Sequence, residues 1–245
     1  MSRKSNKKKN ELRNCVYCGE YTKCTDEHVI ARCLYPDEIK PTKDGFVIVK
    51  ACLKCNGSKS KEDSYMRDRF AVDAAVYDKP ICRSLMKTVL RSHLGNRSDL
   101  CRTALVKHRF TDDALFMPTA SYLGPYVSIP LNIKRERSYL RSIVQGLYWE
   151  MTRQRIPEFT FDYSRIKPVD YGYLLMYFIE HNAMRPVAIG EGVFDWTVMF
   201  GLEDPSVTCW LFRFYEGIYY YASTQHNRRM RKHSSWTKVE SPPAL

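Results

Sequence analysis

The chain has 245 residues, which is enough for one large domain or two small ones with real hydrophobic cores. Hydrophobic residues make up 44% of the chain and aromatic residues 13%, so most of it should fold, and no apolar run is long enough to cross a bilayer. The formal net charge of +12 favours a partner with a phosphate backbone.

The positive charge is concentrated in three segments. Lys and Arg outnumber Asp and Glu in residues 1–13, 79–141 and 226–245, whereas residues 14–78 and 142–225 are acidic overall. We therefore expect a basic disordered arm, a first folded module, a basic helical or linker region, an accessory domain of mixed α and β structure, and a basic tail, in that order. The alternative for the two ends is that their charge serves only solubility.

Two cysteine knuckles, Cys15-x-x-Cys18 and Cys52-x-x-Cys55, are the first motif of the chain. Nine cysteines without an apolar leader segment predict a reducing compartment, where such pairs bind metal more often than they form disulfides. Four thiolates close a tetrahedral Zn²⁺ site that leaves no position open for catalysis. The zinc is therefore expected to be structural, with its binding energy contributing to folding.

The segment between and after the knuckles predicts the order strand, loop, strand, helix. A short strand is expected around residues 28–30, a β-branched strand over 46–52, and a proline-free helix over 56–78. Cys24 and Cys33 compete as zinc ligands by proximity, but neither belongs to a Cys-x-x-Cys pair. We expect both to lie outside the zinc site.

A second helix is predicted to begin at Pro80, a residue favoured in the first turn, and to end at Gly95. Cationic side chains recur on one of its faces every four residues, at Arg83, Lys87 and Arg91. A stripe with this spacing can follow a phosphate backbone. An ordinary solvated helix face is the alternative.

The second half of the chain shows both helical and strand patterns. Residues 111–135 are rich in turns, with a possible short strand in "YVSIPL". An amphipathic helix is expected over 137–154, and the apolar residues 171–182 fit a helix or a strand. Three aromatic, β-branched runs predict an antiparallel meander over residues 187–202, 207–215 and 217–224. We expect the large aromatic residues to belong to the core rather than to stack on bases: Tyr148, Trp149, Phe194 and Trp196.

Glu27, His28 and Asn56 are the candidates for catalysis. A zinc staple would clamp the first strand, which carries Glu27 and His28, against the helix start, where Asn56 follows the last cysteine. Carboxylate and amide oxygens suit a hard cation such as Mg²⁺ or Mn²⁺. An imidazole with a pKa near neutrality can take a proton from water. The three side chains therefore predict metal-assisted phosphodiester hydrolysis.

The order C-x-x-C, EHVI and C-x-x-C-N-x-x-K, over residues 14–70, resembles the HNH endonuclease family in its four-cysteine, zinc-stapled form. The resemblance implies an α+β protein that begins with a ββα-metal module and continues into a mixed α/β domain. It also implies that His28 is the general base and that Glu27 and Asn56 bind the catalytic ion. The products would be a 5′-phosphate and a 3′-hydroxyl.

The chain departs from the family pattern at two positions. Glu27 stands where an aspartate is more frequent, and Val47 replaces the asparagine that braces the loop between the strands. Lys59, one turn after Asn56, is expected to hold the scissile phosphate, with solvated charge as the alternative. Asp63 lies about 10 Å along the helix from Asn56 and is expected to position the helix instead of binding the ion.

These patterns predict a DNA endonuclease of the bacterial cytoplasm that nicks one strand with little sequence specificity; RNA stays open as a substrate. The segments "IVQGLYWEMTRQRIP" and "AIGEGVFDW" resemble parts of bacterial HNH proteins, several of them linked with anti-phage defence, which implies protein partners of a defence system. Two alternatives are a catalytically silent nucleic-acid-binding module and a nuclease subunit activated only by a partner. A plasmid-nicking assay separates them.

Overall fold

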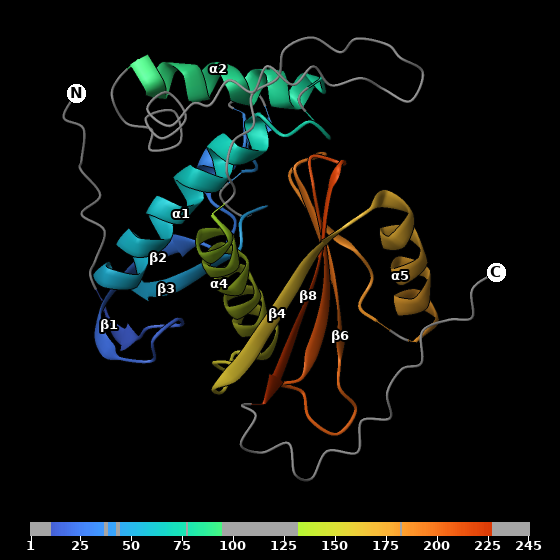
Figure 1. Cartoon of the computed structure of the whole chain (residues 1–245). Coiled ribbons are helices and arrows are strands. Elements are labelled where there is room, and N and C mark those ends of the chain that lie inside the picture. Colours follow the sequence, from blue (N-terminus) through green and yellow to red (C-terminus); the bar gives the residue numbers. More distant parts are fainter. Residues whose placement is uncertain are drawn as a thin grey trace.

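The computed structural model describes residues 11–36, 39–42, 45–76, 78–94, 132–181 and 183–226. Two antiparallel sheets and four long helices account for most of these residues (Figure 1). The fold is therefore mixed α+β, as the sequence predicts. No helix within these ranges is both long and apolar enough to cross a membrane.

The first sheet has the order β1-β2-β3 and consists of β1 (Glu11–Asn14), β2 (Tyr21–His28) and β3 (Ile48–Cys52). The predicted strand around residues 28–30 is wrong in its position, because β2 ends at His28. The strand begins earlier because Tyr21 to Cys24 pair with β1 across the first knuckle. Residues 11–13, assigned from charge to a disordered arm, belong to β1 for the same reason.

Helix α1 (Leu53–Ala71) follows β3 without a loop. Its N-cap is Cys52, whose sulfur accepts a hydrogen bond from the Cys55 N–H at 3.4 Å. The helix therefore starts before Asn56, which lies in its first turn, and ends earlier than predicted. A 3-10 turn (Arg32–Leu34) lies in the connection between β2 and β3.

Helix α2 (Pro80–Leu94) begins at the predicted proline. Its buried residues include Leu85 and Val89, which lie on one side of the helix. Gly95, the turn-rich segment up to residue 131 and the possible strand "YVSIPL" lie outside the described residues.

Helix α4 (Ile133–Thr152) packs against both α1 and β3. The predicted domain boundary between residues 141 and 142 falls inside this helix, so it does not separate two folding units. At Gly146 a Cβ atom would lie 2.5 Å from a methyl group of Val29. The absence of a side chain at Gly146 thus lets α4 pack directly on the side chain of Val29, the residue after His28.

The second sheet has the order β4-β8-β7-β6-β5, and all its neighbouring strands are antiparallel. The predicted meander is present, but its first run is split by a turn at Gly190 and Gly192, which have φ values of 74° and 69°. Strand β4 pairs with β8 and was not predicted. The strands are β4 (Phe159–Ile166), β5 (Val187–Ile189), β6 (Phe194–Phe200), β7 (Thr208–Phe214) and β8 (Ile218–His226).

One hydrophobic core joins the two halves, with buried residues from Val16 to Ala222. Tyr148, Phe194 and Trp196 are buried in it and Trp149 packs at its margin, as expected for core aromatics. Helix α5 (Pro168–Glu180), the apolar segment that fitted helix or strand, is a helix. It covers the side of the second sheet that faces away from α4 (Figure 1).

Candidate functional site

Four cysteines form one cluster where the first knuckle meets the start of α1. Cys15 and Cys18 come from the turn between β1 and β2, whereas Cys52 and Cys55 come from the junction of β3 and α1. Their sulfur atoms all lie within 4.8 Å of one another. This cluster can hold a metal ion such as zinc, because soft thiolates and four close donors match its tetrahedral sites.

Backbone groups around the cluster favour the thiolate form of Cys15, whereas burial raises the pKa of Cys18 and Cys55. The Cys52 N–H donates a hydrogen bond to the Cys15 sulfur at 3.3 Å. Burial raises the pKa of Cys15, but hydrogen bonds from the backbone of Cys18, Cys52 and Tyr17 outweigh it and lower the pKa to about 7.

Cys24 and Cys33 lie outside the four-cysteine cluster, as their position outside the knuckles predicts. Cys24 is fully buried in β2, and its thiol donates to the Arg13 carbonyl oxygen. Cys33 packs against the main core, where burial raises the pKa of its thiol to about 12.

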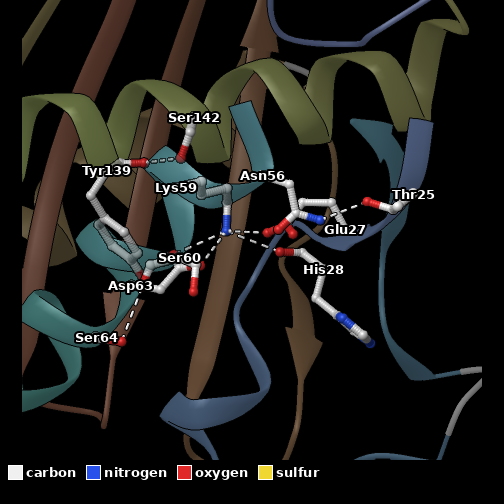
Figure 2. A network of polar contacts seen from close by, with 10 residues as sticks. All are labelled: Thr25, Glu27, His28, Asn56, Lys59, Ser60, Asp63, Ser64, Tyr139 and Ser142. Carbon is white, nitrogen blue, oxygen red and sulfur yellow. Dashed lines mark hydrogen bonds and ion pairs between the residues drawn. The ribbon is translucent and has the colours of Figure 1, made fainter. Parts of the chain in front are cut away.

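Alternate side chains of β2 point toward α1, and side chains one turn apart on α1 meet them. This contact brings the candidate residues together. Thr25 and Glu27 are two residues apart, so both side chains project from one face of the strand. The Asn56 amide donates to the Thr25 hydroxyl at 2.9 Å, and the Lys59 ammonium lies 3.1 Å from the Glu27 carboxylate (Figure 2). The structure thus places Glu27 and Asn56 in the same strand–helix interface.

Lys59 lies in the interior and not at a surface open to a phosphate. Its side chain is 3% exposed, and its ammonium donates to the Asp63 carboxylate at 2.9 and 3.0 Å and to the His28 carbonyl oxygen at 3.0 Å. Burial lowers the pKa of Lys59, but Asp63 and Glu27 outweigh it and raise the pKa above its ordinary value. The expectation that Lys59 holds the scissile phosphate is therefore corrected: its ammonium links two elements of the site, β2 and α1.

Asp63 completes this buried network one turn after Lys59. Burial raises the pKa of its carboxyl to about 6, although the Lys59 ammonium acts in the opposite direction. Asp63 contacts Lys59 and therefore fixes the position of the Lys59 ammonium from the α1 side of the site. With Glu27, Lys59 and Asp63 all ionised, the network contains two carboxylates and one ammonium, and so carries one excess negative charge.

His28 stands at the end of β2 with its backbone and its ring turned in different directions. Its carbonyl oxygen faces Lys59, whereas its imidazole extends away from that ammonium (Figure 2). The ring meets Phe46 edge-on, with centroids 5.1 Å apart and planes at 87°. The imidazole is partly exposed.

The loop after β2 is braced without the asparagine that Val47 replaces. The Val47 carbonyl oxygen accepts a hydrogen bond from the Val29 N–H at 2.9 Å. Phe46 packs edge-on against Tyr35 as well as against His28. An apolar ring contact and a backbone hydrogen bond therefore hold the segment next to His28.

A groove of about 910 Å³ runs over the first sheet and the end of α4. Ile48, the register partner of His28, lies in its wall. Tyr21, with 69% of its surface exposed, presents an aromatic ring there. Cations and a second aromatic residue also line the groove: Arg13, Lys50, Arg153 and Trp149.

The predicted cationic stripe on α2 is present in part. Arg83 and Lys87 are exposed on the face opposite the buried Leu85. The side chain of Arg91 is outside the described part of the chain. The stripe therefore contributes at least two cations to the surface of α2.

Sequence reasoning overlooked two residues that shape the site. Thr25 binds the Asn56 amide, and the period of a strand could have revealed it, because it lies two residues before Glu27. The contact of Phe46 with His28 depends on how a 19-residue connection folds back, for which the sequence carries no local signal.

Comparisons of the chain with protein-family models, curated proteins and solved structures find no match.

Replacing Lys59 with methionine should destabilise the fold by about 3–5 kcal/mol at neutral pH, because it leaves buried carboxylates unpaired at nearly constant side-chain volume. Without the ammonium, the folded-state pKa of Asp63 rises further above its unfolded value near 3.8. The loss should therefore be smallest at pH 4 and grow as the pH rises through the folded-state pKa. Urea unfolding from about pH 4 to pH 8 measures this.

The matched control is Lys50→Met. Lys50 pairs with Asp26 on the same sheet, but the two side chains are 31% and 45% exposed. Its loss should cost at most about 1 kcal/mol with little pH dependence. Equal losses for the two variants would contradict a buried, charge-coupled role for Lys59.

Proposed function

We propose that the protein is a metal-dependent endonuclease of the HNH type that hydrolyses phosphodiester bonds in DNA. The observation that carries this proposal is the grouping of Glu27, His28 and Asn56 where β2 ends and α1 begins, beside a four-cysteine cluster. The order of two antiparallel strands and a helix, with cysteines at the junction, agrees with the module that the sequence resembles.

In this proposal the residues have separate roles in binding the ion, moving the proton and maintaining the fold. Glu27 and Asn56 offer oxygen ligands for Mg²⁺ or Mn²⁺, which when bound supplies Lewis-acid stabilisation of the phosphate charge. His28 takes a proton from the attacking water, and Phe46 limits the rotation of its ring. Zinc at the four cysteines keeps the strand and the helix in register.

The charge balance of the site supports a cation there. Glu27 and Asp63 together have one charge more than Lys59 can neutralise, and all three are at least nine-tenths buried. Excess charge in a buried position is costly unless it is paired. A divalent ion next to Glu27 would offset it, while Lys59 keeps the Asp63 carboxylate turned away from the ion.

The route of the DNA is proposed from charge and aromatic exposure. The groove over the first sheet combines cations with Tyr21 and passes Ile48, opposite His28. Aromatic rings beside cations are the usual surface for single nucleic-acid strands. The chain before β1 adds five Lys or Arg in residues 1–10 with no acidic residue.

A plasmid-nicking assay on the isolated chain tests the proposal. Supercoiled DNA should become open circles with Mg²⁺ or Mn²⁺ and stay intact with EDTA, with 5′-phosphate ends at the nicks. One catalytic site per chain predicts nicks before double-strand breaks. If the plasmid stays intact under all metal conditions, and a single-stranded RNA substrate stays intact as well, nuclease activity of the isolated chain is rejected.

One observation favours a second candidate, a nuclease that stays silent until a partner acts. Lys59 lies against the carboxylate that we assign to the metal. If this ammonium excludes the ion, only a change at Glu27 would allow catalysis. Activity that appears only in a complex would support this version. Partners from a bacterial, cytoplasmic anti-phage system are proposed on the resemblance of the C-terminal segments alone.

The cationic stripe on α2 should contribute to DNA affinity without specificity. A variant with Arg83→Ala, Lys87→Ala and Arg91→Ala should reduce the slope of log affinity against log salt by roughly 0.9 for each phosphate that these side chains neutralise. Fluorescence anisotropy with a labelled duplex at several salt concentrations measures this slope. The control is Arg185→Ala, an exposed cation outside both α2 and α5. A slope equal to that of the wild type would show that the stripe is an ordinary solvated helix face that does not contact DNA phosphates.

A further inference from the structure

The outward side of α5 is apolar although nothing in the described chain covers it. The inner side, with Tyr171 and Phe178, packs on Leu211 of the second sheet. The outer residues recur at the spacing of one helix face. Their exposed fractions are 57% for Val169, 75% for Tyr173, 58% for Met176, 43% for Tyr177 and 55% for Ile179.

A glycine lies on this outer face, near Ile179. Gly172 is exposed, and a Cβ atom built there meets no atom within 4 Å. Packing within the described part of the chain therefore gives no reason for a residue that costs a helix about 1 kcal/mol relative to alanine. A missing side chain does allow the backbone of another helix to come close.

Exposed charges lie at both ends of α5, with Asp170 close to Lys167 in the first turn. Lys167, the N-cap residue, and Glu180, the last residue, are both exposed. When two copies of the helix lie antiparallel, Lys167 of each faces Glu180 of the other. Antiparallel helices also bring opposite ends of their dipoles together. The face is therefore complementary to itself in polarity, and antiparallel packing lets Lys167 contact Glu180.

We propose that α5 is a dimerisation surface, on which a second copy of this chain packs its own α5 antiparallel about a two-fold axis. At roughly 150–250 Å² for each large side chain, the exposed fractions leave on the order of 500 Å² of apolar surface per copy. Two copies together bury on the order of 1,000 Å², which reaches the lower bound for a specific interface. A two-fold axis is the commonest symmetry that buries such a patch.

The dimer stands independently of the proposed nuclease activity. If that activity is also present, a dimer has two catalytic sites, so paired nicks on opposite strands become accessible to one particle. Failure of dimerisation would leave the nicking of single strands untouched.

Sedimentation velocity over a concentration series tests the proposal. The wild type should pass from the monomer to twice the chain mass as the concentration rises. Tyr173→Lys with Met176→Lys should stay monomeric at every concentration while its circular dichroism is unchanged, because both side chains are exposed. Leu202→Lys, which changes a fully exposed leucine outside α5, should dimerise like the wild type.

A charge exchange identifies the antiparallel arrangement. Lys167→Glu and Glu180→Lys should each weaken the dimer, and the double variant should restore it. A wild type that stays monomeric, with or without residues 227–245, overturns the proposal. So does a dimer that persists in the Tyr173→Lys, Met176→Lys variant, because the interface then lies elsewhere.

Discussion

Replacing His28 with alanine should lower the rate of plasmid nicking by about 10² to 10⁴, the range typical of removing a general base. The fold should survive the change, because the imidazole is partly exposed and meets Phe46 only with an edge-on ring. Metal content and DNA affinity should stay at the wild-type level. Single-turnover nicking at saturating Mg²⁺ measures the reduction at the chemical step.

Variants of the proposed ion ligands provide the contrast. Glu27→Gln and Asn56→Ala should also nick slowly, but higher Mn²⁺ or Mg²⁺ should restore part of their rate, because they weaken ion binding and leave the base in place. His28→Ala should show no such rescue. The control is His181→Ala, an exposed histidine that stacks on Tyr177 of α5 and should leave nicking unchanged.

Two outcomes would contradict the assignment of His28. Near-normal nicking by the His28 variant, in a preparation free of contaminating nuclease, would remove the imidazole from the mechanism. Rescue of this variant by metal to the same degree as Asn56→Ala would make His28 an ion ligand. Neither outcome would bear on zinc binding at the cysteines.

Local signals in the sequence predicted elements whose pattern is strong. The Cys-x-x-Cys spacing identified the four cysteines of the cluster, because knuckle turns bring both sulfurs of a pair together whatever the rest of the chain does. Pro80 located the start of α2, and the alternation of aromatic residues located the meander. In each case a few neighbouring residues determine the geometry.

Long-range pairing could not be predicted in the same way. Strand β2 was placed too late, because its N-terminal half is polar and is specified by pairing with β1. The predicted boundary between residues 141 and 142 lies inside α4, because α4 changes composition along its length while it packs on both halves of the molecule. Charge averages over a segment carry no information about which helix face is buried.

Lys59 shows the same limit within the site. The motif C-N-x-x-K says that a lysine follows Asn56 by one turn, but not which way its ammonium points. Its direction depends on Glu27, which the strand period turns toward α1, and on Asp63 at the next turn. A lysine one turn from a carboxylate and facing a strand is better interpreted as a buried ion pair than as a phosphate ligand.

Replacing Cys52 with serine should remove zinc and destabilise the whole first module. Cys52 is at once a member of the four-cysteine cluster, the N-cap of α1 and the residue opposite Cys24 in the sheet. Serine can still cap the helix and pair in the sheet, so the variant isolates the effect of removing one thiolate. Structural zinc sites contribute about 10–16 kcal/mol of binding energy at pH 7, and three ligands retain only part of it.

Cys24→Ser is the matched control for this variant. Cys24 is fully buried and pairs with Cys52 across the sheet, but it lies outside the four-cysteine cluster. Its substitution should keep one zinc per chain and cost about 1–3 kcal/mol, from burying a hydroxyl in place of a thiol.

Elemental analysis and urea unfolding with and without a chelator measure both effects. The wild type and Cys24→Ser should lose stability with the chelator, whereas Cys52→Ser should be low from the start and respond little. Zinc-free wild-type protein that is folded and insensitive to the chelator would show that the four thiols pack as an apolar cluster and hold no metal.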